Sequence, residues 1–289
     1  IVRRLRCGKA DLTAAAADFG GFWAWDVAGE RTYHRFLAAG PARRGRLALR
    51  CEPLGLRLDV TFQPQADCIR ITGELADERG DDRPVVLVWA MPMKGAGMTW
   101  GDDLLRSRRI GEEGRYQNAS AYGAAGRRGG HLLSLYPWCS VTGPGAGVML
   151  ARPLDWPRLT RMFFDHTPSR DLLGITVELG LSPATAKFPS RASFRWVLST
   201  VPQPTWGFRA AVQRYYDLFP HLFARRVQRE GNWHLWVTTD VPDPEDLALV
   251  FHEQEPYLED RVAFDDKHGF YSFTYSEPNT LWQKTGAYD

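Results

Sequence analysis

Alternation of apolar and polar residues, repeated in short runs along residues 1–200, constrains the fold of this chain most strongly. Leu56 and Leu58, for example, flank Arg57, and Ile69 and Ile71 flank Arg70. A period of two puts successive side chains on opposite faces of a β-strand. Clusters of Gly, Pro and Asp separate the runs, which predicts a large antiparallel β-sandwich rather than a βαβ fold. The residues expected inside it are Leu56, Leu58, Val60, Ile69, Ile71, Val86, Val88, Ile175 and Val177.

One run is apolar without alternation. Residues 84–90 carry no charged side chain, which is typical of a central strand covered on both faces. The pattern changes after Pro202, where apolar residues take up helical spacing and predict an amphipathic helix over residues 207–219. The helix positions expected to face an apolar surface are Phe208, Val212, Tyr215 and Phe219.

The tail of the chain has a different pattern. Residues 232–238 are predicted to form a strand, residues 244–251 a helix and residues 270–275 another strand. Strand, helix and strand in this order would open a (β/α) barrel, which needs about 250 residues. Either the barrel is truncated or the tail is a small appendage packed on the sandwich; truncation is favoured, so we expect a mainly β chain in which a sandwich precedes an incomplete barrel. The expected parts are a sandwich domain at 1–202, a linker helix within 203–230 and the barrel start at 231–289.

Composition excludes some classes of function. The net charge of +2 is close to neutral, which argues against a nucleic-acid binder, since such proteins usually have a basic face. No apolar run approaches the roughly 20 residues that span a membrane. The four cysteines have no zinc or redox spacing and are expected to be buried hydrophobes, although a disulfide stays open. No histidine spacing predicts a metal, and no motif predicts a cofactor. The chain begins at Ile1 rather than Met and shows no apolar signal core. With the true N-terminus expected to lie outside this sequence, secretion or a periplasmic location stays open, as does the oligomeric state.

Several strings resemble a known group of proteins. They are Trp206-Gly207-Phe208-Arg209-Ala210-Ala211, Tyr215-Tyr216, Phe219-Pro220, Lys187-Phe188-Pro189-Ser190 and Tyr275-Ser276-Glu277-Pro278. As a set, these strings resemble bacterial glycoside-hydrolase-like proteins. In that group a galactose-mutarotase-like super-sandwich precedes a (β/α) barrel, and loops of the sandwich can border the sugar site. The resemblance implies a carbohydrate substrate and a catalytic pair of carboxylates at the barrel mouth.

Two carboxylates are best placed for that pair. Glycoside hydrolysis uses one carboxyl group to protonate the leaving oxygen and a second to attack or to activate water. Barrel active sites lie at the carboxyl ends of the strands. Glu277 follows the strand predicted to end at Tyr275, and Asp240 follows the strand predicted to end near Thr238. Both positions also suit ordinary loop residues.

Aromatic and polar residues near these positions are candidates for substrate binding. An indole can cover the apolar face of a sugar and donate one hydrogen bond. Trp100 precedes a polar loop, and an exposed aromatic beside aspartates could bind sugar hydroxyls. The full set of candidates is Trp100, Asp102, Asp103, Trp236, His252, Tyr275 and Trp282. Core packing is the alternative for the tryptophans, a surface position at a helix end for His252, and a solvated turn or a calcium site for the aspartate pair.

Two other functions fit the same pattern. A non-catalytic carbohydrate-binding or structural sandwich needs no barrel. A polysaccharide lyase needs a Tyr or His base with a cation near the sugar carboxylate, and Tyr116 and His131 with nearby arginines are the residues available. The sequence favours the hydrolase, as the N-terminal portion of a longer enzyme, and predicts that the chain alone is inactive.

Overall fold

The structure is a computed structural model in which residues 5–7, 9–14, 19–29, 32–120, 133–235, 242–254 and 258–274 are described. The chain divides into two compact units, Ile1–Phe223 and Ala224–Asp289. We call them the sandwich unit and the small unit, and each is described by itself.

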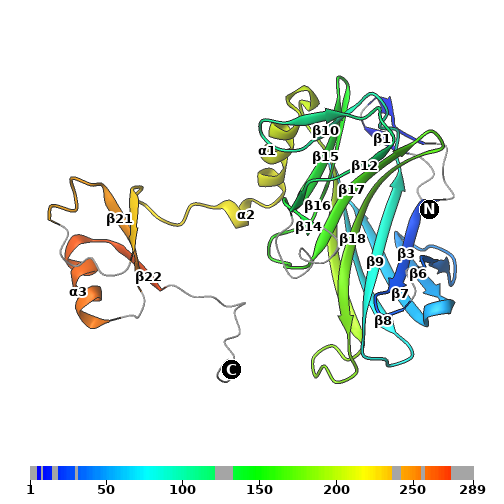
Figure 1. Cartoon of the computed structure of the whole chain (residues 1–289), viewed down its shortest axis with the longest axis horizontal. Coiled ribbons are helices and arrows are strands. Elements are labelled where there is room, and N and C mark those ends of the chain that lie inside the picture. Colours follow the sequence, from blue (N-terminus) through cyan, green and yellow to red (C-terminus); the bar gives the residue numbers. More distant parts are fainter. Residues whose placement is uncertain are drawn as a thin grey trace, which may run out of the picture. The chain divides into compact units, whose positions relative to one another are not determined.

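Two antiparallel sheets form the body of the sandwich unit (Figure 1). The larger has nine described strands, in the spatial order β11 (Ser107–Arg109), β10 (Thr99–Gly101), β15 (Trp138–Gly143), β16 (Ala146–Ala151), β19 (Arg191–Thr200), β8 (Cys68–Asp77), β7 (Leu56–Pro64), β6 (Arg46–Cys51) and β5 (Leu37–Ala38). The smaller has six described strands, in the order β12 (Gly114–Tyr116), β17 (Thr160–Thr167), β18 (Arg170–Leu181), β9 (Arg83–Pro92), β3 (Gly21–Asp26) and β4 (His34–Arg35). Two further antiparallel pairs join β1 (Arg6–Cys7) with β2 (Ala10–Asp11), and β13 (Ala119–Ser120) with β14 (Leu133–Ser134).

The main hydrophobic core joins the facing sides of these two sheets. Alternation along each strand sends every second residue inward, as the sequence pattern predicts. Phe194 and Trp196 of β19 stack with ring centroids 4.2 Å apart, and Trp196 also stacks on Trp89 of β9 at 6.2 Å. The predicted antiparallel sandwich is therefore confirmed.

The predicted interior residues are buried with one partial exception, because Ile69 is half-buried and packs against the core. Val86 and Val88 are buried on the other face of β9, in a separate cluster with Trp25 and Phe163. The strand β9 lies between β18 and β3, so the prediction of a central strand is confirmed.

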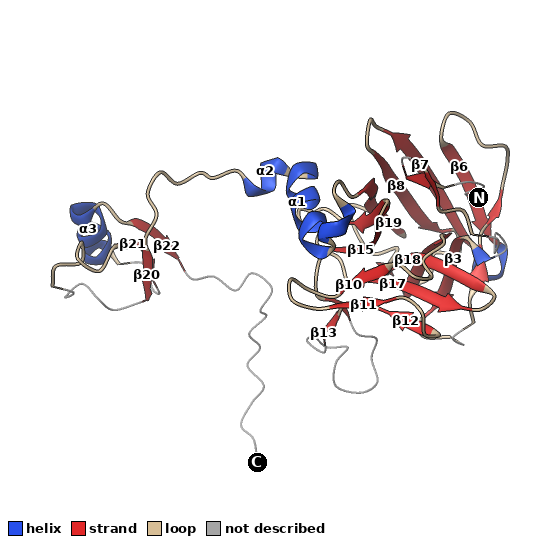
Figure 2. Cartoon of the chain, turned by 90° about the horizontal axis from the view of Figure 1, so that it is seen from above, coloured by secondary structure: helices blue, strands red, loops and turns tan. Residues whose placement is uncertain are grey.

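The helix α1 (Phe208–Leu218) packs on the outer face of the nine-stranded sheet, followed by the short helix α2 (Pro220–Phe223) (Figure 2). Its buried residues Phe208 and Tyr215 join Trp138 and Met149 from the sheet in a second apolar cluster, and Phe219 completes it. This confirms the predicted amphipathic helix, with Val212 only partly buried. Two single-turn 3-10 helices, Glu52–Leu54 and Pro204–Trp206, lie in connections of the sandwich unit.

The described residues of the small unit form three parallel strands in the order β20 (Asn232–Leu235), β21 (Leu249–Gln254) and β22 (Tyr271–Thr274). Helix α3 (Glu259–His268) connects β21 to β22, with acids in its first turn, Lys267 and His268 in its last, and Gly269 as a left-handed C-cap. Parallel strands need a crossover connection, usually a helix, and the repeating unit of a (β/α) barrel is a strand followed by such a helix.

The predicted helix over residues 244–251 is wrong. Residues 244–247 form a turn, and β21 begins at Leu249. Asp243 and Ala248 adopt positive φ values of 48° and 50°, which end any helix at both sides of this segment. Pro244 and the acids after it resemble a helix start, but Val250 and Phe251 favour a strand and Val250 is buried in it.

All four cysteines are buried and carry free thiols, as expected for small core residues. No helix in the described ranges is long and apolar enough to cross a membrane.

Candidate functional site

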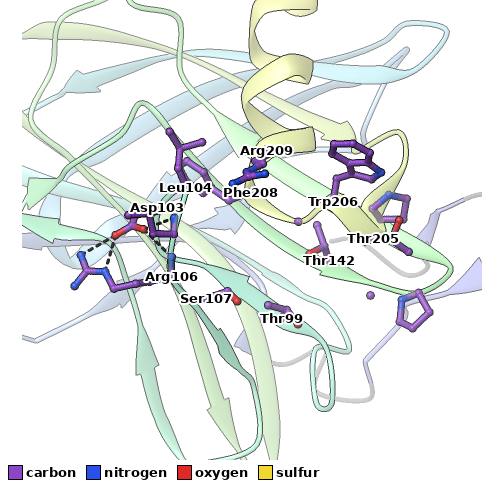
Figure 3. A pocket seen from close by; sticks show the side chains of 15 residues that line it. Thr99, Asp103, Leu104, Arg106, Ser107, Thr142, Thr205, Trp206, Phe208 and Arg209 are labelled. Carbon is purple, nitrogen blue, oxygen red and sulfur yellow. Dashed lines mark hydrogen bonds and ion pairs between the residues drawn. The ribbon is translucent and has the colours of Figure 1, made fainter.

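A groove of about 690 Å³ lies on the sandwich unit, between the turn that joins β10 to β11 and the segment that leads into α1. Figure 3 shows Trp206 and Thr205 at one side, Asp103 and Arg106 at the other, and Thr142 between them. We call it the Trp206 groove. Thr142 and Phe208 are nearly buried and form its base, whereas most residues at the rim are exposed.

Backbone geometry places Trp206 at the rim. The turn Pro204–Trp206 ends at Gly207, whose φ of 58° and ψ of −127° suit glycine and strain other residues. Gly101 of β10 lets the start of α1 come close, because a Cβ there would meet the Phe208 side chain at 3.1 Å. The indole of Trp206 is left 64% exposed, and a second hollow of about 490 Å³ flanks it on the side of Gln213 and Asp217.

Hydrogen bonds fix the opposite rim. The Asp103 carboxylate accepts the backbone N–H of Leu105 at 2.8 Å and that of Arg106 at 2.7 Å, and the Arg106 guanidinium also pairs with it. These bonds, that from Leu105 first, lower the pKa of Asp103 and keep it ionised. Neighbouring Asp102 forms a bidentate pair with Arg108, at 2.8 and 2.7 Å.

The groove can bind a ligand but lacks a catalytic pair. Among the described residues that line it, Asp103 is the one carboxylate, and its pKa is moved away from the range of a general acid. Two carboxyl groups would be needed for glycoside hydrolysis. An exposed indole together with threonine, serine and arginine side chains instead suits hydroxyl-rich ligands that have an apolar face. The predicted calcium alternative has no support in this part of the chain, since no described residues form a cluster that could hold a metal.

The prediction of an exposed, sugar-binding Trp100 is wrong. The indole is fully buried in the core, and its N–H donates to the Asn118 side-chain oxygen at 2.8 Å. Every second residue of β10 points inward, so Trp100 packs in the core while Thr99 lines the groove. Tyr116, one of the two candidate bases for a lyase, is also buried, and its hydroxyl donates to the Glu112 carbonyl at 3.0 Å. His131 lies outside the described residues.

His252 also takes a different place from the one predicted. It belongs to β21 and is fully buried, rather than lying at a helix end. His234, His252 and Ser272 are register partners across the three parallel strands. Asp265 of α3 lies over this row and accepts hydrogen bonds from Ser272 and Gln254, and it is 2.6 Å from His252 Nδ1.

This polar row forms the buried contact between α3 and the sheet of the small unit. His234 stacks on His252 with ring centroids 4.2 Å apart, and both of its ring nitrogens are buried. Burial, reinforced by His252, lowers the pKa of His234. The Asp265 carboxylate and the His252 imidazole are fully buried, whereas His234 and Ser272 are half-buried. The predicted site residues Trp236, Asp240, Tyr275, Glu277 and Trp282 lie outside the described residues.

The comparisons with known proteins add information on the fold. No protein-family model matches the chain, and no curated protein matches it in sequence. The crystal structure of the GH36 alpha-galactosidase AgaA from Geobacillus stearothermophilus matches 93% of this chain at 12% identity, with a TM-score of 0.51. An alpha-galactosidase from Lactobacillus brevis matches 92% of this chain at 12% identity, with a TM-score of 0.49. A galactose mutarotase related enzyme from Lactobacillus acidophilus matches 57% of this chain at 6% identity, with a TM-score of 0.26.

The chain spans about half the length of the two alpha-galactosidases, 48% and 46% respectively. At these identities the likeness concerns the fold alone. The match to AgaA confirms, at the level of the fold, the expected resemblance to glycoside-hydrolase-like proteins.

Proposed function

We propose that this chain is part of a glycoside hydrolase that acts on an oligo- or polysaccharide through paired carboxylates. The observation that carries the proposal is the extent of the fold match. The likeness to AgaA covers 93% of the chain, a share that residues 1–223 alone cannot supply, so it reaches into the small unit. Fold supports a function only by analogy, and AgaA is an alpha-galactosidase.

In this proposal the two units have different tasks. The carboxylates Glu277 and Asp240 follow the strands β22 and β20 and would supply the acid and the nucleophile or base. The Trp206 groove would hold a sugar unit, with the indole against an apolar sugar face.

The catalytic part of the proposal is tested by Glu277→Gln in the intact protein. Glutamine keeps the shape but cannot ionise or transfer a proton, so we expect kcat to fall about 100-fold or more. Glu259→Gln is the matched control, because Glu259 is exposed in the first turn of α3. A Glu277→Gln protein with wild-type kinetics would remove Glu277 from the site.

The binding part is tested by Trp206→Ala, with substrates of increasing length. We expect KM to rise for substrates long enough to bind along the groove, because the variant loses the contact of the indole with the sugar. Phe188→Ala is the control, since Phe188 is a similarly exposed aromatic (54%) elsewhere on the sandwich unit. An unchanged KM at every length would refute the role of the groove.

A non-catalytic carbohydrate-binding protein is the second candidate. The Trp206 groove favours this function because its described lining holds one carboxylate, Asp103, whereas hydrolysis needs two. Sugar binding that depends on Trp206, in an intact protein without any turnover, would establish this function instead.

A further inference from the structure

A second hollow, of about 290 Å³, lies on the outer face of the six-stranded sheet, away from the Trp206 groove. Gly174 of β18, Ala90 of β9 and Gly21 of β3 are register partners across three neighbouring strands (Figure 1). Three small residues in one row leave this part of the sheet without bulky side chains. Phe163 lies over Gly174, where a Cβ would meet its ring at 2.4 Å, so the open space is above Ala90.

Aromatic side chains surround this space. Trp23 of β3 and Phe163 of β17 belong to the apolar cluster beside it. Tyr33 is 49% exposed and Phe19 is 44% exposed, although both line the same hollow. A gathering of exposed aromatic rings around a concave surface is typical of a binding site, because burial would otherwise be favoured.

The polar groups of the hollow carry an excess of positive charge. Arg115 forms a bidentate pair with Asp165, at 2.7 and 2.8 Å, and is neutralised by it. The Arg170 guanidinium lies 5.0 Å from the centroid of the Phe19 ring. Its Nε is buried without a hydrogen-bond partner, and among the described residues no carboxylate pairs with it. The lining thus holds one guanidinium whose charge is not neutralised by a carboxylate among the described residues.

We propose that this hollow binds one carboxylated sugar unit, such as a uronate, with the sugar ring against the aromatic wall and its carboxylate on Arg170. The inference rests on the proposed function only for its ligand class, a carbohydrate. An arginine fork matches a carboxylate in a bidentate geometry, and it is less strongly hydrated than a lysine ammonium. Aromatic faces supply the contact with the apolar side of the ring.

The test is calorimetric titration of the full chain with oligosaccharides of glucuronate, galacturonate or mannuronate and with their neutral hexose counterparts. We expect one uronate series to bind, and its neutral counterpart to bind about ten-fold more weakly or less. Absence of binding by every uronate at millimolar concentration, or equal binding of the neutral sugar, would overturn the proposal.

Two variants locate the binding. Ala90→Leu places a side chain in the hollow and should abolish binding, whereas Ala48→Leu, on the exposed face of β6, should not. Arg170→Gln should lower the uronate affinity to that of the neutral sugar. Arg158 is the control, because its guanidinium also lies near an aromatic ring, 5.7 Å from the centroid of Trp156, and Arg158→Gln should leave the uronate affinity unchanged. An Ala90→Leu chain that keeps its melting temperature and binds like the wild type would overturn the proposal. If Ala90→Leu does not fold, Arg170→Gln decides.

This experiment fails independently of the hydrolase proposal. It measures binding without turnover, and neither variant substitutes Glu277 or a residue that lines the Trp206 groove. Uronate binding in an intact protein that hydrolyses nothing would refute the hydrolase alone, whereas hydrolysis without uronate binding would refute the hollow alone.

Discussion

Docking of α1 on the sandwich depends most on one side chain, Tyr215. Its ring is fully buried, with centroids 4.7 Å from Trp138 and 4.9 Å from Phe219. Its hydroxyl donates to the Arg152 carbonyl at 2.8 Å. Truncating a buried aromatic side chain to alanine costs about 3–5 kcal/mol, and a lost hydrogen bond adds about 1 kcal/mol. We therefore expect Tyr215→Ala to lower the free energy of unfolding of the sandwich unit by about 4–6 kcal/mol.

Tyr215→Phe separates the two contributions, because it removes the hydroxyl and keeps the ring. It should cost only about 1 kcal/mol. The adjacent Tyr216 is the matched control: it is 43% exposed, and Tyr216→Ala should cost less than about 1 kcal/mol. Urea unfolding followed by tryptophan fluorescence suits the measurement, since Trp138 contacts the mutated ring. Equal losses for Tyr215→Ala and Tyr216→Ala would refute the docking described here.

Three further predictions concern other parts of the fold. Val212 is half-buried against the same cluster, so Val212→Asp should cost about 1–3 kcal/mol in urea unfolding, and a melting temperature equal to the wild type would contradict this. Asp77 is enclosed and pairs with buried Arg83 at 2.7 Å, and Arg83 also pairs with Asp26 at 3.2 Å. Asp77→Ala removes one charged partner and leaves the other, so it should cost about 1.5–3 kcal/mol, against at most about 1 for exposed Asp59, paired with Arg57; similar losses at both sites would be the wrong result. The lowered pKa of His234 means that the unfolded chain binds a proton first, so stability of the small unit is fully present above the ordinary value of 6.5 and falls as the pH drops below it. Denaturation of the small unit between pH 8 and 5 should show this loss, His234→Phe should reduce it, and an unchanged slope in the variant would count against the assignment.

Period-two alternation predicted the sandwich well because each strand buries one face. Leu56, Leu58 and Ile175 are in the core, where the pattern placed them. The same rule could not tell which face of an all-apolar strand would meet the core. Val86 and Val88 are buried on the outer side, and Val85 and Leu87 fill the core instead.

Prediction of the site was weaker, because it depended on which loops meet in space. Asp103 was predicted and lies at the rim of the groove, but Trp100 was assigned to the surface although it faces the core. Trp206 was missed as a binding residue, and its signal was available. A tryptophan between Pro204 and Gly207, just before a helix, sits in a turn that leaves a large side chain little to pack against. The pairing of His252 with Asp265 could not be predicted, because the segment before His252 was assigned to a helix.

Turnover measured side by side on the chain and on the intact protein tests the central claim most directly. A panel of aryl glycosides, alpha-galactosides among them, and polysaccharides would be offered to both. We predict hydrolysis by the intact protein and none by the chain alone, because the three parallel strands among the described residues of the small unit are too few to close a ring that holds two carboxylates at a fixed separation. Robust turnover by the chain alone, or an intact protein inactive on the whole panel, would contradict the account.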